Sequence, residues 1–307
     1  MITINKENIF YSFTKENTIS HRVTSGTTLA IETCDCFQDQ ITSEDTELKA
    51  LDWNQINPAT GAVYVEGAEP GDILKVKIEK IELGDKGVMM VQPGLGVMGH
   101  RIEESEVKMI PIDGNKAVFN EDIRVPLNPM IGVIGVAPED GAVSNGTPGA
   151  HGGNMDTKLI AEGSTLYFPV FQEGALFGLG DLHAAMGDGE ISVSGIEIPG
   201  KVTVTLEVVK GSSIPYPFVE TSEGLAVIVS KETVDEAAKS AVEIMIDTML
   251  PQTDLTLNEL TMLFSAAGQS QISQIVDPLM TARFFVPCYL VDKVGKPGFL
   301  GDEDEEV

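Results

Sequence analysis

Histidine and carboxylate side chains gather in one glycine-rich stretch of the chain, residues 149–190. His151 and His183 lie there, and Asp181 precedes His183 by two positions. Side chains two positions apart in an extended segment project from the same face, and an imidazole beside a carboxylate suits zinc or a similar divalent ion. The spacing therefore predicts a metal pair at Asp181 and His183. A structural hydrogen bond from His183 and a turn capped by Asp181 would explain the same residues.

Further ligands are expected from segments near this pair. His151 or Asp156 could complete the shell from a neighbouring loop, and Glu32 and Asp35 of the segment ETCDCF are acids that could enter the same site. A catalytic metal keeps one coordination position open and activates a water there. Ordinary polarity at the end of a strand accounts for Glu32 and Asp35 equally well.

Glu190 is the candidate general base. It ends the glycine-flanked turn GDGE, and a carboxylate on a rigid strand can accept a proton from a nearby water. If Asp188 and Gly189 only form a hairpin turn, Glu190 would face solvent, but the following ISVSGIEI reads as the start of a buried strand. Nucleophiles have less support, because the chain has no G-x-S-x-G elbow. Cys34 and Cys36 lie on one face of an expected strand and are most simply core residues.

Charge and composition exclude several classes of protein. The 307 residues include 47 acidic and 20 basic side chains, a net charge of −27, which repels nucleic acid but not a neutral substrate. The longest apolar runs, such as 130–137, are too short to cross a membrane, and the N-terminus lacks the pattern of a secretory signal. With only three cysteines, no disulfide framework is expected, and a reduced, cytoplasmic location follows.

Hydrophobic periodicity changes along the chain. Alternating or apolar runs separated by Gly and Pro predict strands in the first two thirds, as in a β-sandwich or barrel. These strands are expected at 27–32, 62–67, 73–81, 130–136, 165–171, 190–198 and 201–209. Helical spacing then predicts helices at 231–248 and 256–267 and a third short one before Asp277. The expected parts are a mainly β unit (1–210) with the site, an α/β portion packed against it (211–301) and a disordered acidic tail (302–307).

Four segments of the chain resemble the acetamidase/formamidase family. They are NPATGAVYVEGAEPGDILKVKIEKIEL (57–83), HGGNMD (151–156), YFPVFQEGALFGLGDLHAAMGDGE (167–190) and SQIVDP (273–278). The resemblance implies a hydrolase that cleaves the C–N bond of short linear amides, such as acetamide and formamide, to a carboxylate and ammonia. It also implies a mainly β, sandwich or jelly-roll-like architecture with an α/β C-terminal portion, and a homodimer or larger homo-oligomer.

The residues and the resemblance together give one mechanistic hypothesis. A divalent metal, with zinc preferred, activates water, and Glu190 moves its proton to the leaving ammonia. Calcium is the alternative, as a structural ion. Backbone amides of Gly152 and Gly153 or the side chain of Asn154 hold the oxyanion. The predicted catalytic residues are Glu190, Asn154 and His151. The predicted metal ligands are Asp181, His183, Asp35, Glu32 and Asp156.

Two other classes stay open. One is a metal-independent amidase in which a carboxylate or Cys34 is the nucleophile. The other is a non-catalytic protein on the same scaffold that binds a metal or a small ligand, since function resides in the site and not in the fold.

Overall fold

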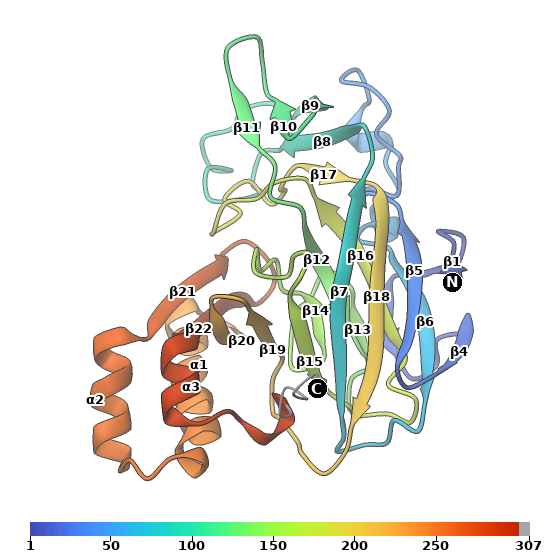
Figure 1. The fold of residues 1–307 in the computed structure, drawn as a ribbon. Helices are drawn as coiled ribbons and strands as arrows, with labels where there is room; N and C mark the ends of the chain where they lie inside the picture. Colours follow the sequence, from blue (N-terminus) through green and yellow to red (C-terminus); the bar gives the residue numbers. More distant parts are fainter. Residues whose placement is uncertain (301–307) are drawn as a thin grey trace.

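The computed structural model describes residues 1–300, so the acidic tail predicted at 302–307 lies outside the described residues. Two large β-sheets lie face to face, and three helices pack beside the C-terminal strands (Figure 1). This confirms the predicted mainly β sandwich with an α/β C-terminal portion. Among these residues, no helix has the length and apolarity that crossing a bilayer requires.

The first sheet has nine strands and runs through both parts of the chain. In spatial order they are β1 (Ile2–Ile4), β5 (Thr27–Thr33), β18 (Gly200–Val209), β7 (Ile73–Leu83), β15 (Thr165–Pro169), β19 (Phe218–Thr221), β20 (Gly224–Lys231), β22 (Met280–Pro287) and β21 (Gln269–Gln274). Because β15 pairs with β19, the sheet continues past residue 210. The division into two parts at that residue stays a prediction.

The second sheet carries most of the site. Its main path is β11 (Arg124–Pro126), β10 (Lys116–Val118), β9 (Glu106–Asp113), β8 (Lys86–Val91), β17 (Glu197–Ile198), β16 (Phe177–His183), β12 (Met130–Gly135) and β14 (Gly152–Asn154). Strand β6 (Ala59–Glu66) pairs with β16 and also with β2 (Ile9–Phe10) and β4 (His21–Thr24). A separate pair joins β3 (Ser12–Thr14) to β13 (Ala142–Ser144).

The alternation of β7 shows how sequence pattern sets this sheet. Val76 and Ile78 point into the core, and the next inward residue is Ile81, three positions on. The pairing with β18 shifts here, since Thr203 faces Lys80 and Val204 faces Ile78. Glu79 is therefore the extra residue of a β-bulge, which moves the buried positions by one.

Residues from both sheets share one apolar core. Leu29 and Val204 of the first sheet belong to the same buried cluster as Ile131 and Leu179 of the second, as expected for a sandwich. A second core lies between β20, β22 and the helices α1 (Val234–Met249) and α3 (Cys288–Val294). The remaining helices are α2 (Leu257–Ala267) and the short η1 (Leu48–Ala50), η2 (Trp53–Gln55), η3 (Leu250–Gln252) and η4 (Gly298–Leu300).

The helix predictions are right for α1 and α2. Thr233 caps α1 by accepting the N–H of Glu236, so the helix begins three residues after the predicted start at 231. Thr256 and Glu259 form a capping box that begins α2. The third predicted helix is wrong, because residues 269–274 pair with β22 as β21. Helix α3 has no counterpart in the sequence predictions.

Two strand predictions also need correction. Of the strand expected at 190–198, only Glu197–Ile198 is a strand, and the preceding residues form a loop folded back by turns. Strand β5 ends at Thr33, so Cys34 and Cys36 lie beyond it and do not share a strand face. Long-range contacts, rather than local propensity, determine both segments.

Candidate active site

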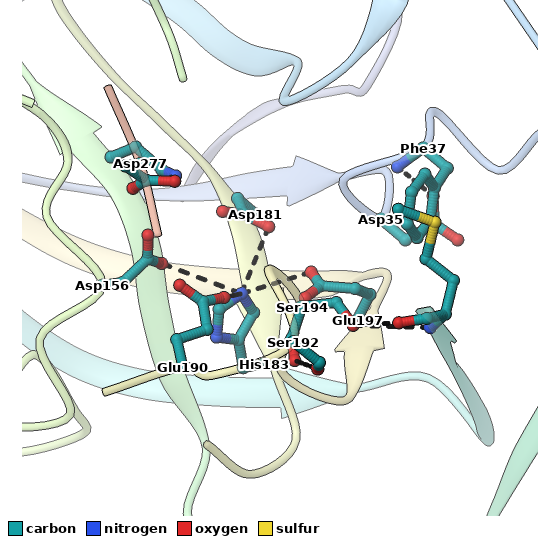
Figure 2. A network of polar contacts seen from close by, with 12 residues as sticks. Asp35, Phe37, Asp156, Asp181, His183, Glu190, Ser192, Ser194, Glu197 and Asp277 are labelled. Atoms are coloured by element: carbon teal, nitrogen blue, oxygen red, sulfur yellow. Dashed lines mark hydrogen bonds and ion pairs between the residues drawn. The ribbon is translucent and has the colours of Figure 1, made fainter. Parts of the chain in front are cut away.

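His183 lies at the centre of a buried cluster of acids. It ends β16, all seven residues of which are buried. Four carboxylate oxygens approach its Nε2 atom, at 3.2 Å (Glu197), 3.4 Å (Asp181) and 3.9 Å (Asp156 and Glu190) (Figure 2). The structure thus brings together four of the site residues that the sequence predicted, from segments that meet only in the folded sheet.

Each acid of the cluster comes from a different local structure. Asp181 precedes His183 by two positions on β16, and Glu197 faces His183 directly across the β16–β17 pair. Asp156 follows β14, which is the neighbour of β12 at the edge of the sheet. Glu190 follows a turn whose Gly189 donates its N–H to the carbonyl of Ser273, in the C-terminal part of the chain. Four segments therefore have to fold together before the cluster exists.

Three of these acids have backbones in the left-handed region. The φ angles are +40° for Asp156, +54° for Asp181 and +46° for Glu190. Residues other than glycine are uncommon in this region, and such strained positions concentrate at functional sites because the surrounding structure has to hold them there. The packed strands around the cluster supply that restraint.

Gly132 on β12 provides the space in which two of the acids meet. A Cβ at this position would lie 2.5 Å from Asp156 Oδ1 and 2.6 Å from Asp181 Oδ2. A side chain as small as alanine therefore cannot be added unless both carboxylates move. Gly132 itself lies outside the positive-φ region, so the requirement is for space and not for backbone freedom.

We expect Gly132→Ala to lower kcat at least about 100-fold, because catalytic groups displaced by about 1 Å lose that much. The measurement is steady-state ammonia release from an amide substrate, with thermal unfolding as the test of folding. Gly146→Ala is the matched control, since the nearest atom to a Cβ there is 3.6 Å away. Equal activity of the two variants would show that the Asp156 and Asp181 positions do not matter for turnover.

Burial and crowding of like charges set the ionisation of the cluster. Burial raises the pKa values of Asp156 and Glu190 well above their usual range, and neighbouring carboxylates raise them further. Burial raises the pKa of Glu197 to about 8, although His183 opposes the shift. Burial alone would lower the pKa of His183, but Glu197 and Asp181 raise it well above its usual value. The cluster therefore favours a positive charge among its oxygens.

Several of these polar atoms make no hydrogen bond within the protein. His183 Nε2, Asp181 Oδ1, Glu197 Oε2 and both side-chain oxygens of Asp156 are buried without a hydrogen bond. Buried polar atoms are almost always paired, so unpaired ones need an explanation such as a bound ion. Asp156, His183 and Glu190 can direct one atom each to a common position, and so can Cys36, Asp181 and Glu197. Imidazole, carboxylate and thiolate are all zinc ligands, and the residues therefore fit a divalent metal.

Asn154 and His151, the two other residues predicted to be catalytic, differ in their connection to the cluster. Asn154 donates from Nδ2 to Asp277 Oδ2 at 2.9 Å, and Asp277 lies beside Asp156 (Figure 2). His151 is buried in an edge-to-face contact with Phe13, and burial lowers its pKa to about 4. Within residues 1–300, no hydrogen bond or ion pair joins His151 to the acids around His183. Of this pair, only Asn154 reaches the cluster, through Asp277.

Asp35 and Glu32 have other local roles. One oxygen of Asp35 accepts the backbone N–H groups of Phe37 and Asp39, so this buried carboxylate caps a turn, and burial raises its pKa to about 6. Glu32 alternates with the inward-facing Ile31 and Thr33 and lies on the opposite face of β5. It lines a surface depression with Lys6 and Lys201. The structure does not place Glu32 among the ligands.

Glu197, Asp277 and Cys36 belong to the site although the sequence prediction omitted them. Glu197 lies between the buried Ile196 and Ile198, and an acid between apolar residues was the available signal. Asp277 lies in the segment SQIVDP, which carried the resemblance but had no assigned role. Cys36 lies in an apolar core cluster, as the sequence predicted, and its sulfur also lies within reach of Asp181 and Glu197.

A buried arginine fastens the turn that precedes Glu190. Arg283 on β22 is 1% exposed and donates from Nη2 to Asp188 Oδ2 at 2.8 Å. Its other nitrogens donate to Gln271 and to Ser273 of β21. Ser273 Oγ also accepts from Thr157, the neighbour of Asp156. The C-terminal strands therefore position both loops that carry acids of the cluster.

The architecture and this acid cluster define a β-sandwich protein with a buried His–carboxylate site. The sequence model of the Acetamidase/Formamidase family matches residues 4–145 and 142–293. The chain belongs to this family, which confirms the resemblance drawn from the four segments.

Individual relatives agree with the family. The crystal structure of acetamidase from Bacillus halodurans is 46% identical with a TM-score of 0.94, covering 96% of this chain and 100% of that one. The crystal structure of a predicted acetamidase/formamidase from Thermoanaerobacter tengcongensis is 50% identical with a TM-score of 0.94, and the match covers 95% of this chain and 97% of that one. The formamidase of Methylophilus methylotrophus is 25% identical over 63% of this chain and 62% of its own length. The chain thus matches less than two thirds of that curated relative.

Proposed function

We propose that this chain hydrolyses the C–N bond of linear amides to a carboxylate and ammonia. The observation that carries the proposal is the approach of four carboxylate oxygens to His183 Nε2 within 3.9 Å, in a buried cluster several of whose polar atoms make no hydrogen bond. Family membership and the names of the relatives, acetamidase and formamidase, support the same reaction.

The chain's own residues supply the proton transfers. Glu190 lines a cavity that opens to solvent and lies 3.9 Å from His183, so it can reach both a substrate and the cluster. As general base it accepts the proton of the attacking water, and as general acid it returns a proton to the leaving nitrogen. Asn154 has two amide hydrogens and uses one for Asp277. The second is a candidate donor to the oxyanion.

A divalent cation fits the same cluster. Asp156, Asp181 and His183 would hold it, and Cys36 and Glu197 offer further ligand atoms within 4.8 Å of Asp181. Its chemistry there would be to polarise the amide carbonyl and to lower the pKa of the attacking water. Zinc is the preferred ion because nitrogen, oxygen and sulfur donors are all present.

Two features from the sequence hypothesis lose support. The N–H of Gly152 donates to the carbonyl of Gly149, so it is engaged and is not an oxyanion donor. Burial raises the pKa of Cys34 to about 12. The Cys34 thiol therefore stays protonated, and a thiol is a poor nucleophile compared with a thiolate.

The proposal is tested by ammonia release from formamide and acetamide, before and after treatment with a chelator. We expect turnover that the chelator removes and that added zinc or a similar divalent ion restores. Elemental analysis of the treated protein verifies metal removal. Full activity in verified metal-free protein would contradict the metal, and no ammonia from any amide would contradict the reaction. The homo-oligomer and the cytoplasmic location stay predictions.

A further inference from the structure

A cavity of about 560 Å³ opens beside Glu190 and is much larger than the smallest amides require. Pockets of roughly 300–1,000 Å³ are typical of sites for much larger organic ligands, whereas acetamide has a single methyl group beyond its amide. Gly195 forms part of the wall. A Cβ on Gly195 would lie 2.6 Å from His183 Nδ1, so only backbone separates the cavity from the imidazole there.

The cavity wall is mostly apolar. Side chains of this kind come from strands β8 and β11 and from the loops around the site, namely Met89, Phe119, Val125, Met186, Ile191 and Ile196. Burying apolar groups of a ligand against such a wall is favourable in proportion to the area removed from water. The wall therefore offers binding energy to hydrocarbon, which formamide does not carry.

The polar groups of the wall are mostly engaged within the protein. Ser192 Oγ donates to the carbonyl of Ser194, and Ser194 Oγ donates to the carbonyl of Met90. Asp188 pairs with both Arg283 and Lys158. The carboxylate of Glu190 thus stands in a chamber whose other polar side chains are Asn128, Asp188, Ser192 and Ser194. None of the lining residues is basic, so an anionic acyl group would find no partner of opposite charge there.

We propose that this cavity is the acyl-binding subsite and that the preferred substrates are primary amides with extended apolar acyl groups, rather than formamide or acetamide. The inference rests on the proposed amide hydrolysis, because it places the substrate carbonyl at Glu190. The acyl chain then extends from Glu190 past Met186 and Ile196 toward Phe119 at the mouth.

A chain-length series measures the preference. We expect kcat/KM for ammonia release to rise at least about tenfold from acetamide to hexanamide, because each additional methylene enters apolar surroundings. Formamide should be the poorest substrate of the series. Hydrolysis of acetamide with a flat or falling kcat/KM toward hexanamide would overturn the inference and leave the proposed function intact.

Two variants of one hairpin locate the preference. Phe119 and Ile123 flank the turn between β10 and β11 and are 37% and 51% exposed, but only Phe119 lines the cavity. We expect Phe119→Asp to lower kcat/KM for hexanamide at least about fivefold and to change that for acetamide less than about twofold. Ile123→Asp should leave both values unchanged. Equal effects of Phe119→Asp on both amides, or of both variants on hexanamide, would overturn the inference.

Binding without turnover separates this inference from the reaction. Calorimetric titration of the slow Glu190→Gln variant with hexanamide and with acetamide should show tighter binding of hexanamide, and adding Phe119→Asp should remove the difference. If no amide is hydrolysed and this binding preference is present, the proposed reaction fails and the apolar subsite stands. If the preference is absent, the subsite fails whatever the outcome for hydrolysis.

Discussion

Replacing Glu190 by glutamine is expected to lower kcat for amide hydrolysis by about 10²–10⁴-fold, the usual contribution of a positioned general acid–base group. Glutamine keeps the size of the side chain but cannot accept the proton of the water or return it to the leaving nitrogen. Glu190 is 7% exposed, lies beside His183 and lines the cavity, so its carboxylate can reach both the cluster and a bound amide. The measurement is steady-state ammonia release from acetamide and hexanamide.

Folding and charge have to be separated from the loss of the base. Glu207→Gln is the matched control, because Glu207 has a half-exposed side chain paired with Lys75 on the outer face of the sheet. It makes the same chemical change without touching the cluster. Both variants should unfold with similar thermal midpoints. Near-wild-type turnover by Glu190→Gln would remove Glu190 from the mechanism and point to another acid of the cluster.

The second large effect is expected from His183→Gln. This change removes the only imidazole among four carboxylates, and we expect loss of bound divalent metal together with at least about a 100-fold loss of kcat. Mutating a residue that only orients a metal ligand lowers metal affinity or activity by about 10–100-fold. Mutating a direct ligand should therefore have a larger effect. Metal content by elemental analysis and ammonia release are measured on the same samples.

His100→Gln is the control for this experiment, since His100 is exposed in a loop between β8 and β9. It should retain both metal and turnover. Because the substitution leaves the four acids without their central partner, thermal unfolding of His183→Gln should be measured with and without zinc. A folded His183→Gln protein that keeps its full metal content would contradict the assignment of His183 as a ligand.

The central part of the site could be predicted from local sequence. Asp181 and His183 share a strand, so their i, i+2 spacing alone places them on one face, and the structure finds them 3.4 Å apart. The helices α1 and α2 were predictable because their apolar periodicity and their capping residues agree. In each case the information lies within one segment of the chain.

The errors concern segments whose structure depends on distant partners. Residues 269–274 have no strong preference of their own and become β21 because β22 offers a free edge. The segment 190–196 alternates like a strand but is folded into a loop, and its turn is held by Ser273 and by Arg283 through Asp188. From sequence alone, Glu32 is as good a candidate ligand as the other acids. The alternation of β5 places its side chain on the outer face of the sheet, away from the cluster.

The sequence by itself determined the mainly β class, the family and the central Asp181–His183 pair, because periodicity and spacing act over a few residues. Only the tertiary structure decided that Glu197 on β17 faces His183 on β16, that Asp277 reaches Asp156 from the C-terminal part, and that Gly132 leaves room for two carboxylates. Those contacts join residues far apart in the chain. Their positions follow from strand register and sheet packing, which no single segment specifies.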